Sequence, residues 1–205
     1  MNSIKELKYG NTKCYLINDK VMIDTDWAGT LQKFFKCIKQ ENVVLKDIEY
    51  LLITHFHPDH MGIAQELADL GIKIIVFEEQ KDYIHYSDNI FEKDNKINFK
   101  SINDDNISIL PCIDSRRLLE SVGVFGEVLH TPGHSEDSIS IILDDGIAVV
   151  GDLYPLYSVP AYNNKKLEES WNNILSHNIH LIYYAHAEKN KIENIKSIDD
   201  IIHNR

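Results

Sequence analysis

Three histidines and one aspartate fall within six residues in the stretch Thr54-His55-Phe56-His57-Pro58-Asp59-His60. The apolar run at residues 50–53 predicts a β-strand just before it, and extended backbone points His55 and His57, two residues apart, the same way. Pro58 cannot continue a central strand, so the chain turns there and one loop presents all four side chains. Neutral imidazole and carboxylate are ligands that Zn²⁺ and Fe²⁺ accept. We therefore interpret this loop as part of a metal site.

The number of ligand-type side chains in this loop points to more than one ion. Four ligands are too many for a single tetrahedral ion that must also keep a water molecule. Two ions that both bind to this loop account for all four. The competing interpretation is an exposed polar turn with coincidental histidines. The density of an uncommon residue type at a regular spacing disfavours it.

The composition is that of an acidic globular chain of 205 residues. This length predicts one large domain, or at most two small ones, with a sizeable core. The chain has 21 Lys and Arg residues against 32 Asp and Glu residues, which gives a formal net charge of −11. Such a chain repels phosphate backbones unless it carries a local basic stripe, and the sequence has none. We therefore expect no nucleic-acid partner.

The cysteines and the apolar runs bear on the compartment. Cys14, Cys37 and Cys112 are odd in number and form no CxxC pair, which excludes a fully paired disulfide framework and indicates a reducing environment. No apolar run approaches the ~18 residues of a membrane span, and residues 1–7 lack the apolar core of a signal peptide. We expect a cytoplasmic protein without a membrane partner, and the oligomeric state stays open.

The hydrophobic pattern alternates between strand-rich and mixed segments. Apolar runs predict strands at residues 12–17, 21–24, 50–53, 73–77, 107–110, 125–129, 138–143, 147–150 and 180–184. Helical spacing predicts helices at residues 31–38, 63–70, 165–176 and 192–202. Residues 79–106 are polar and predict a surface insertion, with a helix through Tyr83 and Tyr86 and a loop at 94–96; a solvated loop is favoured over a lid. This order predicts two packed sheets with helices outside.

The histidine-rich loop resembles the HxHxDH signature of the metallo-β-lactamase superfamily, and Thr54 before it also fits. The remaining motifs follow in the family's order. Residues 131–135 (TPGHS) resemble its TPGH[TS] loop, Gly151-Asp152 its GD at a strand end, and Tyr184-Ala185-His186 its last ligand histidine. The resemblance spans residues 4–188, which is nearly the whole chain.

The resemblance implies an α+β fold, the four-layer αββα metallo-β-lactamase sandwich, which we expect as a single domain over residues 1–205. It also implies a binuclear centre with two divalent ions, for which zinc is favoured and iron or manganese are alternatives. By this resemblance the first ion is held by His55, His57 and His134. The second ion is held by Asp59, His60 and His186, and Asp152 bridges the two.

The implied centre has a positive net charge. Two divalent ions contribute +4, the carboxylates of Asp59 and Asp152 contribute −2, and a bridging hydroxide leaves +1. Zinc lowers the pKa of bound water to about 7, so hydroxide is available at neutral pH. We expect Asp59 to orient this hydroxide. A positive centre in an acidic protein also favours an anionic or carbonyl-bearing small molecule as the substrate.

Other polar residues near these motifs are candidates for supporting roles. Asp24 lies in a stretch that resembles the family's IDTG, with Asp26 in place of the glycine, and we expect it to hydrogen-bond a ligand histidine. Related lactonases place a phenol three residues after the bridging aspartate. Tyr154 and Tyr157, two and five residues after Asp152, are the corresponding candidates for polarising a substrate carbonyl, with packing as the open alternative.

Among the chemistries of the family, these features favour hydrolysis of a small molecule. Asp152 argues against the β-lactamases with HxHxDH, which usually lack the bridging aspartate, and the acidic charge argues against a tRNA-processing nuclease. Only 19 residues follow His186, so we do not expect the C-terminal domain with which glyoxalase II holds glutathione. The expected enzyme is a compact glyoxalase II-like or lactonase-like metallo-hydrolase of a carboxylic thioester, ester or lactone.

Two alternatives come from other classes of protein. A mononuclear iron sulfur dioxygenase, similar to the persulfide dioxygenases, would use only part of the same ligand set, and its iron content and oxygen uptake would distinguish it. A binding protein with a degenerate site is the second alternative. The sequence gives no reason for it, because all seven ligand positions carry ligand-type residues.

Overall fold

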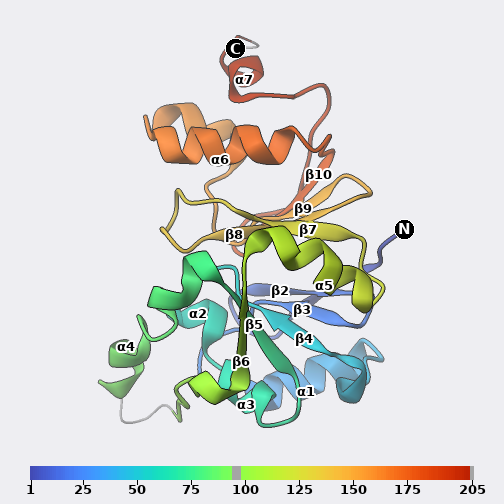
Figure 1. Cartoon of the computed structure of the whole chain (residues 1–205), viewed down its shortest axis with the longest axis vertical. Coiled ribbons are helices and arrows are strands. Elements are labelled where there is room, and N and C mark those ends of the chain that lie inside the picture. Colours follow the sequence, from blue (N-terminus) through green and yellow to red (C-terminus); the bar gives the residue numbers. More distant parts are fainter. Residues whose placement is uncertain (94–97, 204–205) are drawn as a thin grey trace.

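The computed structural model describes residues 1–93 and 98–203, and its strands form two sheets (Figure 1). The first sheet has the spatial order β1 (Ile4–Lys8), β2 (Lys13–Ile17), β3 (Val21–Ile23), β4 (Tyr50–Leu52), β5 (Lys73–Phe77) and β6 (Ile107–Leu110). Its first three strands are antiparallel, and β3 to β6 run parallel.

The second sheet is mixed as well. Its spatial order is β11 (Asn190–Lys191), β10 (Leu181–Tyr183), β9 (Ile147–Val149), β8 (Ile139–Leu143) and β7 (Gly126–His130). The neighbours β9 and β10 run parallel, and the other neighbours run antiparallel. A tight turn at Asp144-Asp145-Gly146 connects β8 to β9, and Gly146 has a φ of +78° there.

The helices of the described chain are α1 (Leu31–Gln40), α2 (Pro58–Met61), α3 (Ala64–Ala68), α4 (Asp88–Glu92), α5 (Ser115–Ser121), α6 (Lys165–Leu175) and α7 (Ile198–His203). Figure 1 shows α1 and α3 on the outer side of the first sheet and α6 and α7 on the outer side of the second. Within the residues that the structure describes, every helix is too short or too polar to cross a bilayer.

Side-chain alternation along the strands explains the layers. Successive side chains of a strand point to opposite faces of its sheet. Ile75 of β5 lies in the apolar cluster that joins the two sheets, whereas its neighbour Ile74 packs with Phe34 of α1. On the outer face of the second sheet, Ile182 packs with Trp171 of α6. The order helix, sheet, sheet, helix confirms the predicted αββα sandwich.

The predicted helix at residues 192–202 is wrong in its first half. Asn190–Lys191 forms β11 beside β10, and Asn194 has a φ of +59°, a left-handed conformation that no helix can continue through. The helix therefore begins only at Ile198. A second correction is that residues 4–8 form β1, a strand that the hydrophobic pattern did not predict.

The predicted helix through Tyr83 and Tyr86 is also wrong. A 3₁₀ helix covers Glu78–Tyr83, Tyr86 lies in a turn, and α4 begins at Asp88. The segment is not a plain solvated loop either, because Gln80, Ser87 and Phe91 are buried in it. The loop predicted at residues 94–96 lies outside the described residues.

Candidate metal centre

The four sequence motifs lie at the ends of strands that meet where the two sheets touch. Residues 54–60 follow β4, residues 131–134 follow β7, and Gly151-Asp152 follows β9. The parallel pairing of Val149 with Tyr183 brings the ends of β9 and β10 together, so that Asp152 and His186 lie near each other. The backbone N–H of Ile139 in β8 donates to the carbonyl of Thr54 at 2.8 Å, which ties the second sheet to the histidine-rich loop.

Two buried carboxylates fix the backbone of the histidine-rich loop. Asp24 accepts hydrogen bonds from the N–H of Thr54 at 2.6 Å and from its hydroxyl at 2.8 Å. Asp137 accepts from the N–H of Phe56 at 2.7 Å, and the buried Gln80 amide donates to the Asp137 carbonyl at 3.1 Å. Sequence reasoning missed Asp137 and Gln80, because these contacts join residues that are far apart in the chain.

Asp24 also determines the orientation of His60. The Nδ1 atom of His60 lies 2.9 Å from a carboxylate oxygen of Asp24, so Nδ1 carries a proton and donates it to Asp24, while Nε2 faces the centre. The expected hydrogen bond between Asp24 and a histidine of the motif is therefore present, with Asp24 as the acceptor. Asp24 itself has a φ of +61°, in the left-handed region that aspartate tolerates better than most residues.

The first group of histidines converges from two motifs. The Nε2 atom of His55 lies 3.0 Å from Nδ1 of His57, and the same Nδ1 lies 3.1 Å from Nε2 of His134. The ligand-type nitrogens of all three residues lie within 4.8 Å of one another. The histidine that follows β7 therefore meets the two that follow β4, as one shared ion requires.

The second group combines a carboxylate with two imidazoles. The Nε2 atom of His186 lies 3.0 Å from a carboxylate oxygen of Asp59, and Nε2 of His60 lies 3.9 Å from the same oxygen. These three ligand-type atoms also lie within 4.8 Å of one another. The carbonyl of Asp59 accepts a 2.7 Å hydrogen bond from the Thr12 hydroxyl, which fixes the backbone at this position.

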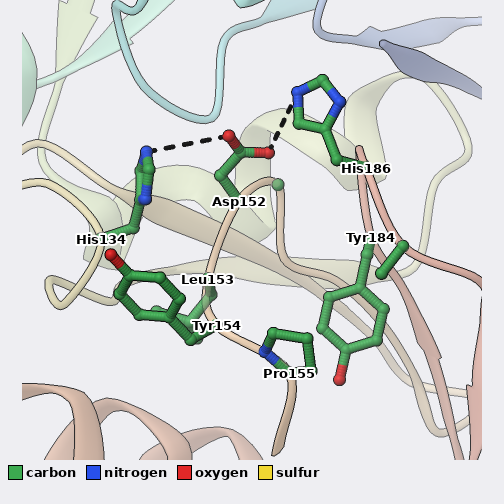
Figure 2. Close-up of a pocket in the computed structure, with 9 residues that line it drawn as sticks. His134, Asp152, Leu153, Tyr154, Pro155, Tyr184 and His186 are labelled. Carbon is green, nitrogen blue, oxygen red and sulfur yellow. Dashed lines mark ion pairs between the residues drawn. The ribbon is translucent and has the colours of Figure 1, made fainter. Parts of the chain in front are cut away.

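Asp152 lies between the two groups, and Figure 2 shows its carboxylate between His134 and His186. Its Oδ1 atom is 3.5 Å from Nε2 of His60 and 3.5 Å from Nε2 of His186. Its Oδ2 atom is 3.7 Å from Nε2 of His134. One oxygen thus faces each group. A side chain at Gly151 would collide with Thr54, so the close approach of the two strand ends needs this glycine.

Two buried polar atoms without a hydrogen-bond partner indicate whether these residues suit a metal ion. Within the described part of the chain, Nε2 of His60 and Oδ1 of Asp152 are buried and have no hydrogen-bond partner. A buried polar atom without a partner costs about 1–3 kcal/mol, so such atoms are rare unless an ion or ligand completes them. An imidazole nitrogen and a carboxylate oxygen are both donors that zinc and iron accept. The donor set therefore fits a metal site.

The protonation of the metal-free histidines differs from residue to residue. Burial lowers the pKa of His55 well below its usual range, and the neighbouring imidazoles lower it further. Burial likewise lowers the pKa of His134. Burial also opposes the charged form of His60, but the carboxylates of Asp24 and Asp152 outweigh it and raise its pKa to about 10.

The carboxylates of the site are ionised at neutral pH. Burial tends to raise the pKa of Asp59, but the hydrogen bond from His186 and the charge of His60 outweigh it and lower the pKa to about 2. Asp152 behaves in the same way, because burial is outweighed by His60 and the pKa of the carboxyl is lowered. The hydrogen bond to Asp59 in turn raises the pKa of His186. Metal binding at neutral pH therefore competes with a proton at His60.

A cavity of about 270 Å³ opens beside Asp152, His134 and His186. Tyr154 lines it, and Figure 2 shows the Tyr154 ring on the His134 side, where the two ring centroids are 5.8 Å apart. Tyr157 does not line this cavity: its side chain is 64% exposed and lines a neighbouring cavity. The structure thus brings one of the two candidate phenols to the centre, and a catalytic role for either stays a prediction.

The comparison with protein families matches the description "Metallo-beta-lactamase superfamily" to residues 7–186. This match covers most of the chain and includes all four motifs. The chain therefore belongs to the metallo-beta-lactamase superfamily.

Two proteins with similar sequences indicate a class of activity. A probable metallo-hydrolase of Methanocaldococcus jannaschii is 27% identical over 158 residues, which are 74% of this chain and 71% of that protein. An atrochrysone carboxyl ACP thioesterase of Pseudocercospora fijiensis is 26% identical over 129 residues, which are 62% of this chain and 31% of that protein. Together with the family match and the His/Asp cluster, they indicate a metal-dependent hydrolase.

Solved structures support the fold. A metallo-beta-lactamase family protein of Thermus thermophilus has a TM-score of 0.65 at 17% identity, over 99% of this chain and 77% of that chain. A protein solved in a di-iron-bound form has a TM-score of 0.63 at 19% identity, over 93% of this chain and 88% of that chain. At such identities the likeness shows the fold alone.

Proposed function

We propose that the protein is a binuclear metallo-hydrolase that cleaves a small carboxylic thioester, ester or lactone. The observation that carries the proposal is the position of Asp152, whose two carboxylate oxygens face different histidine groups at 3.5 and 3.7 Å. A carboxylate in this position is suited to bridge two ions, as two-metal hydrolytic sites require. The thioesterase among the relatives supports a thioester or ester as the substrate class.

The proposed ligands fall into the two groups that the interatomic distances define. His55, His57 and His134 would hold one ion, Asp59, His60 and His186 the other, and Asp152 would bridge them. Two such divalent ions supply Lewis acidity and lower the pKa of water to about 7. Zinc suits this nitrogen and oxygen donor set, and iron is the alternative that the di-iron-bound neighbour supports.

Asp59 is the proposed base that orients the attacking water. Its carboxylate is ionised at neutral pH, accepts a hydrogen bond from His186, and is only part-buried, so an oxygen remains accessible to water. Its backbone is held by Thr12. An ionised, positioned carboxylate can accept a hydrogen bond from water and direct its lone pair at a carbonyl carbon.

Tyr154 is the proposed donor to the substrate carbonyl. Its ring stacks on Tyr162 with centroids 4.2 Å apart, and its backbone carbonyl accepts a 3.0 Å hydrogen bond from the indole of Trp171. These contacts hold the phenol beside His134 before a substrate arrives. A preorganised donor of this kind stabilises the negative charge that develops on the carbonyl oxygen.

The cavity beside Asp152 continues toward a cation, which supports an anionic substrate. It shares Pro155, Tyr184 and Ala187 with the neighbouring cavity of about 280 Å³, which Lys189 lines. The carboxylate of Glu188 in the same lining is paired with Lys13 at 2.7 Å. The Lys189 ammonium, which lies 5.7 Å from the centroid of the Tyr183 ring, is the proposed partner of an anionic group of a substrate whose carbonyl lies at the centre.

Metal analysis and a substrate panel test this proposal together. We expect two equivalents of metal in the replete protein and turnover of thioesters or lactones, but not of β-lactams or phosphodiesters. Asp152→Ala removes the bridge and one negative charge, so one ion and the hydrolysis should both be lost, whereas Asp105→Ala changes an exposed carboxylate and should change neither. An Asp152→Ala variant with two ions and full turnover contradicts the mechanism. One bound iron with oxygen uptake and no hydrolysis would replace it by the dioxygenase.

A further inference from the structure

A second cavity lies beside the candidate metal centre, on the side of His57. It has a volume of about 260 Å³, and its lining includes Phe56, Tyr83 and Tyr86 together with His57 and His134. We propose that this cavity is a subsite for a planar aromatic group of the substrate, with Tyr83 and Tyr86 as its specificity-determining residues. The proposal deepens the hydrolase function above and rests on it for the reaction, though not for the binding.

The aromatic rings of the lining point to an aromatic occupant. The Tyr86 ring centroid lies 6.5 Å from that of Tyr83 and 6.5 Å from that of His57, so the three rings are neighbours around the cavity. The Tyr86 side chain is 65% exposed although it adjoins the centre. Aromatic rings favour offset or edge contacts at centroid separations of 4.5–7 Å, and a planar group in the cavity would make such contacts with more than one ring.

The segment that carries both tyrosines is attached to the histidine-rich loop itself. The buried Ser87 hydroxyl donates to the carbonyl of Phe56 at 2.5 Å. The buried Gln80 amide donates to the carbonyl of Ile53 at 2.8 Å, just before the motif. The tyrosines are thus fixed relative to His57 on both sides of the segment. A subsite fixed in this way binds without the entropic cost of ordering a loop.

The charges around the cavity favour a neutral occupant. Glu136 in the lining pairs with Lys166 at 2.7 Å, and the buried Asp137 accepts the N–H of Phe56. The lining, which falls entirely within the described residues, contains no lysine or arginine. An anionic group would find no lysine or arginine here, in contrast to the cavity that Lys189 lines. The two cavities therefore suit different parts of one substrate.

His134 connects the two cavities, because it lines both of them. A carbonyl that reacts at the centre has Tyr154 and the first cavity on one side and the aromatic cavity on the other. The aromatic group would then belong to the part of the substrate that lies across the scissile bond from the Asp152 cavity. We place the aromatic group on the thiol or alcohol leaving group, because an anionic group of the acyl part would lie toward Lys189.

Two thioesters of the same acid test the subsite. S-benzyl and S-propyl thioacetate have the same acyl group and similar alkyl thiol leaving groups, so their ratio of kcat/KM reports on recognition of the ring. We expect the wild type to prefer the benzyl thioester about tenfold, which corresponds to about 1.4 kcal/mol. Tyr83→Ala and Tyr86→Ala should each reduce the preference at least threefold. Tyr86→Phe should keep it, and Phe125→Ala, a control at another exposed aromatic residue, should leave it unchanged.

The outcomes separate failure of the subsite from failure of the hydrolase proposal. Hydrolysis of both thioesters with a ratio that the tyrosine variants do not change overturns the subsite and leaves the hydrolase standing. If neither thioester is hydrolysed, binding of benzyl methyl sulfide and propyl methyl sulfide is compared by saturation-transfer NMR. Selective binding of the benzyl compound that Tyr86→Ala abolishes supports the subsite, and equal binding of both compounds overturns it.

Discussion

Replacing Asp24 with asparagine should perturb the metal centre although it replaces none of the proposed ligands. Asp24 accepts hydrogen bonds on both oxygens, from the N–H of Thr54 on Oδ1 and from the Thr54 hydroxyl and Nδ1 of His60 on Oδ2. An amide has one oxygen and one NH₂ group, so either orientation turns a donor toward a donor. With the NH₂ group toward His60, Nδ1 must accept rather than donate, so a neutral imidazole carries its proton on Nε2, the atom that faces Asp152.

The magnitude follows from what each orientation loses. A protonated Nε2 cannot bind a metal, and removal of a partner behind a ligand histidine typically lowers metal affinity 10- to 100-fold, or about 1.4–2.8 kcal/mol. The opposite orientation leaves the buried N–H of Thr54 facing an amide NH₂ group, which costs about 1–3 kcal/mol of folding free energy. We expect the variant to show weaker binding of one ion and a lower unfolding midpoint.

A competition titration against a chromophoric chelator measures both metal affinities. The matched control is Asp69→Asn, which makes the same chemical change in a half-exposed carboxylate at the end of α3. The variant should release one ion at a chelator concentration at which the control and the wild type retain two. Circular dichroism checks that all three proteins are folded. Retention of both ions at wild-type affinity in a folded Asp24→Asn protein would refute the reasoning.

Three further predictions follow from the site. Because His60 has a pKa of about 10 and is protonated in the metal-free protein at pH 7, zinc binding at that pH should release at least one proton. The release is detected as different calorimetric heats in two buffers of unequal ionisation enthalpy. Gly151→Ala should lower the unfolding temperature more than Gly71→Ala, because both glycines have positive φ but only the first would collide with a side chain. The pKa of Asp59 is lowered from 3.8 to about 2 in the folded, metal-free protein, so its contribution to stability is complete above pH 3.8 and is lost as the pH falls toward 2. Asp59→Asn should therefore reduce the loss of unfolding free energy between pH 3.8 and 2, measured by acid unfolding.

The loop at residues 54–60 could be predicted as a ligand loop from its own residues, whereas the convergence of the later motifs on it followed from the family resemblance. The spacing within residues 54–60 places four ligand-type side chains in one loop after β4. The later motifs follow β7, β9 and β10 of the other sheet, and the hydrophobic pattern does not show that these strand ends meet the loop. The hydrogen bond of Asp24 was also expected, because its stretch resembles the family's IDTG. The residue types alone then indicated a metal, as neutral imidazoles and carboxylates seldom gather for another reason.

The supporting residues could not be predicted, because their roles depend on contacts between distant segments. Gln80 and Asp137 lie 57 residues apart and act on the loop only through the packed sandwich. Their polar segments read as solvent-exposed, yet both side chains are buried and satisfied by backbone partners. The strand at residues 4–8 was not predicted for a related reason. As an edge strand it has Leu7 as its one buried residue, so its hydrophobic pattern is weak.

The position of the candidate centre has a consequence for the fold itself. The loop with His55, His57 and His60 extends from the first sheet, whereas His134 and Asp152 follow strands of the second. Each proposed ion would therefore have ligands from both sheets, and binding would join the two halves of the sandwich at the edge where Ile139 and Thr54 already share a backbone hydrogen bond. An ion that binds only the assembled sheets adds its binding free energy to the folding free energy. The buried, unpartnered atoms that weaken the metal-free sandwich at this edge are thus the same atoms through which a metal would stabilise it.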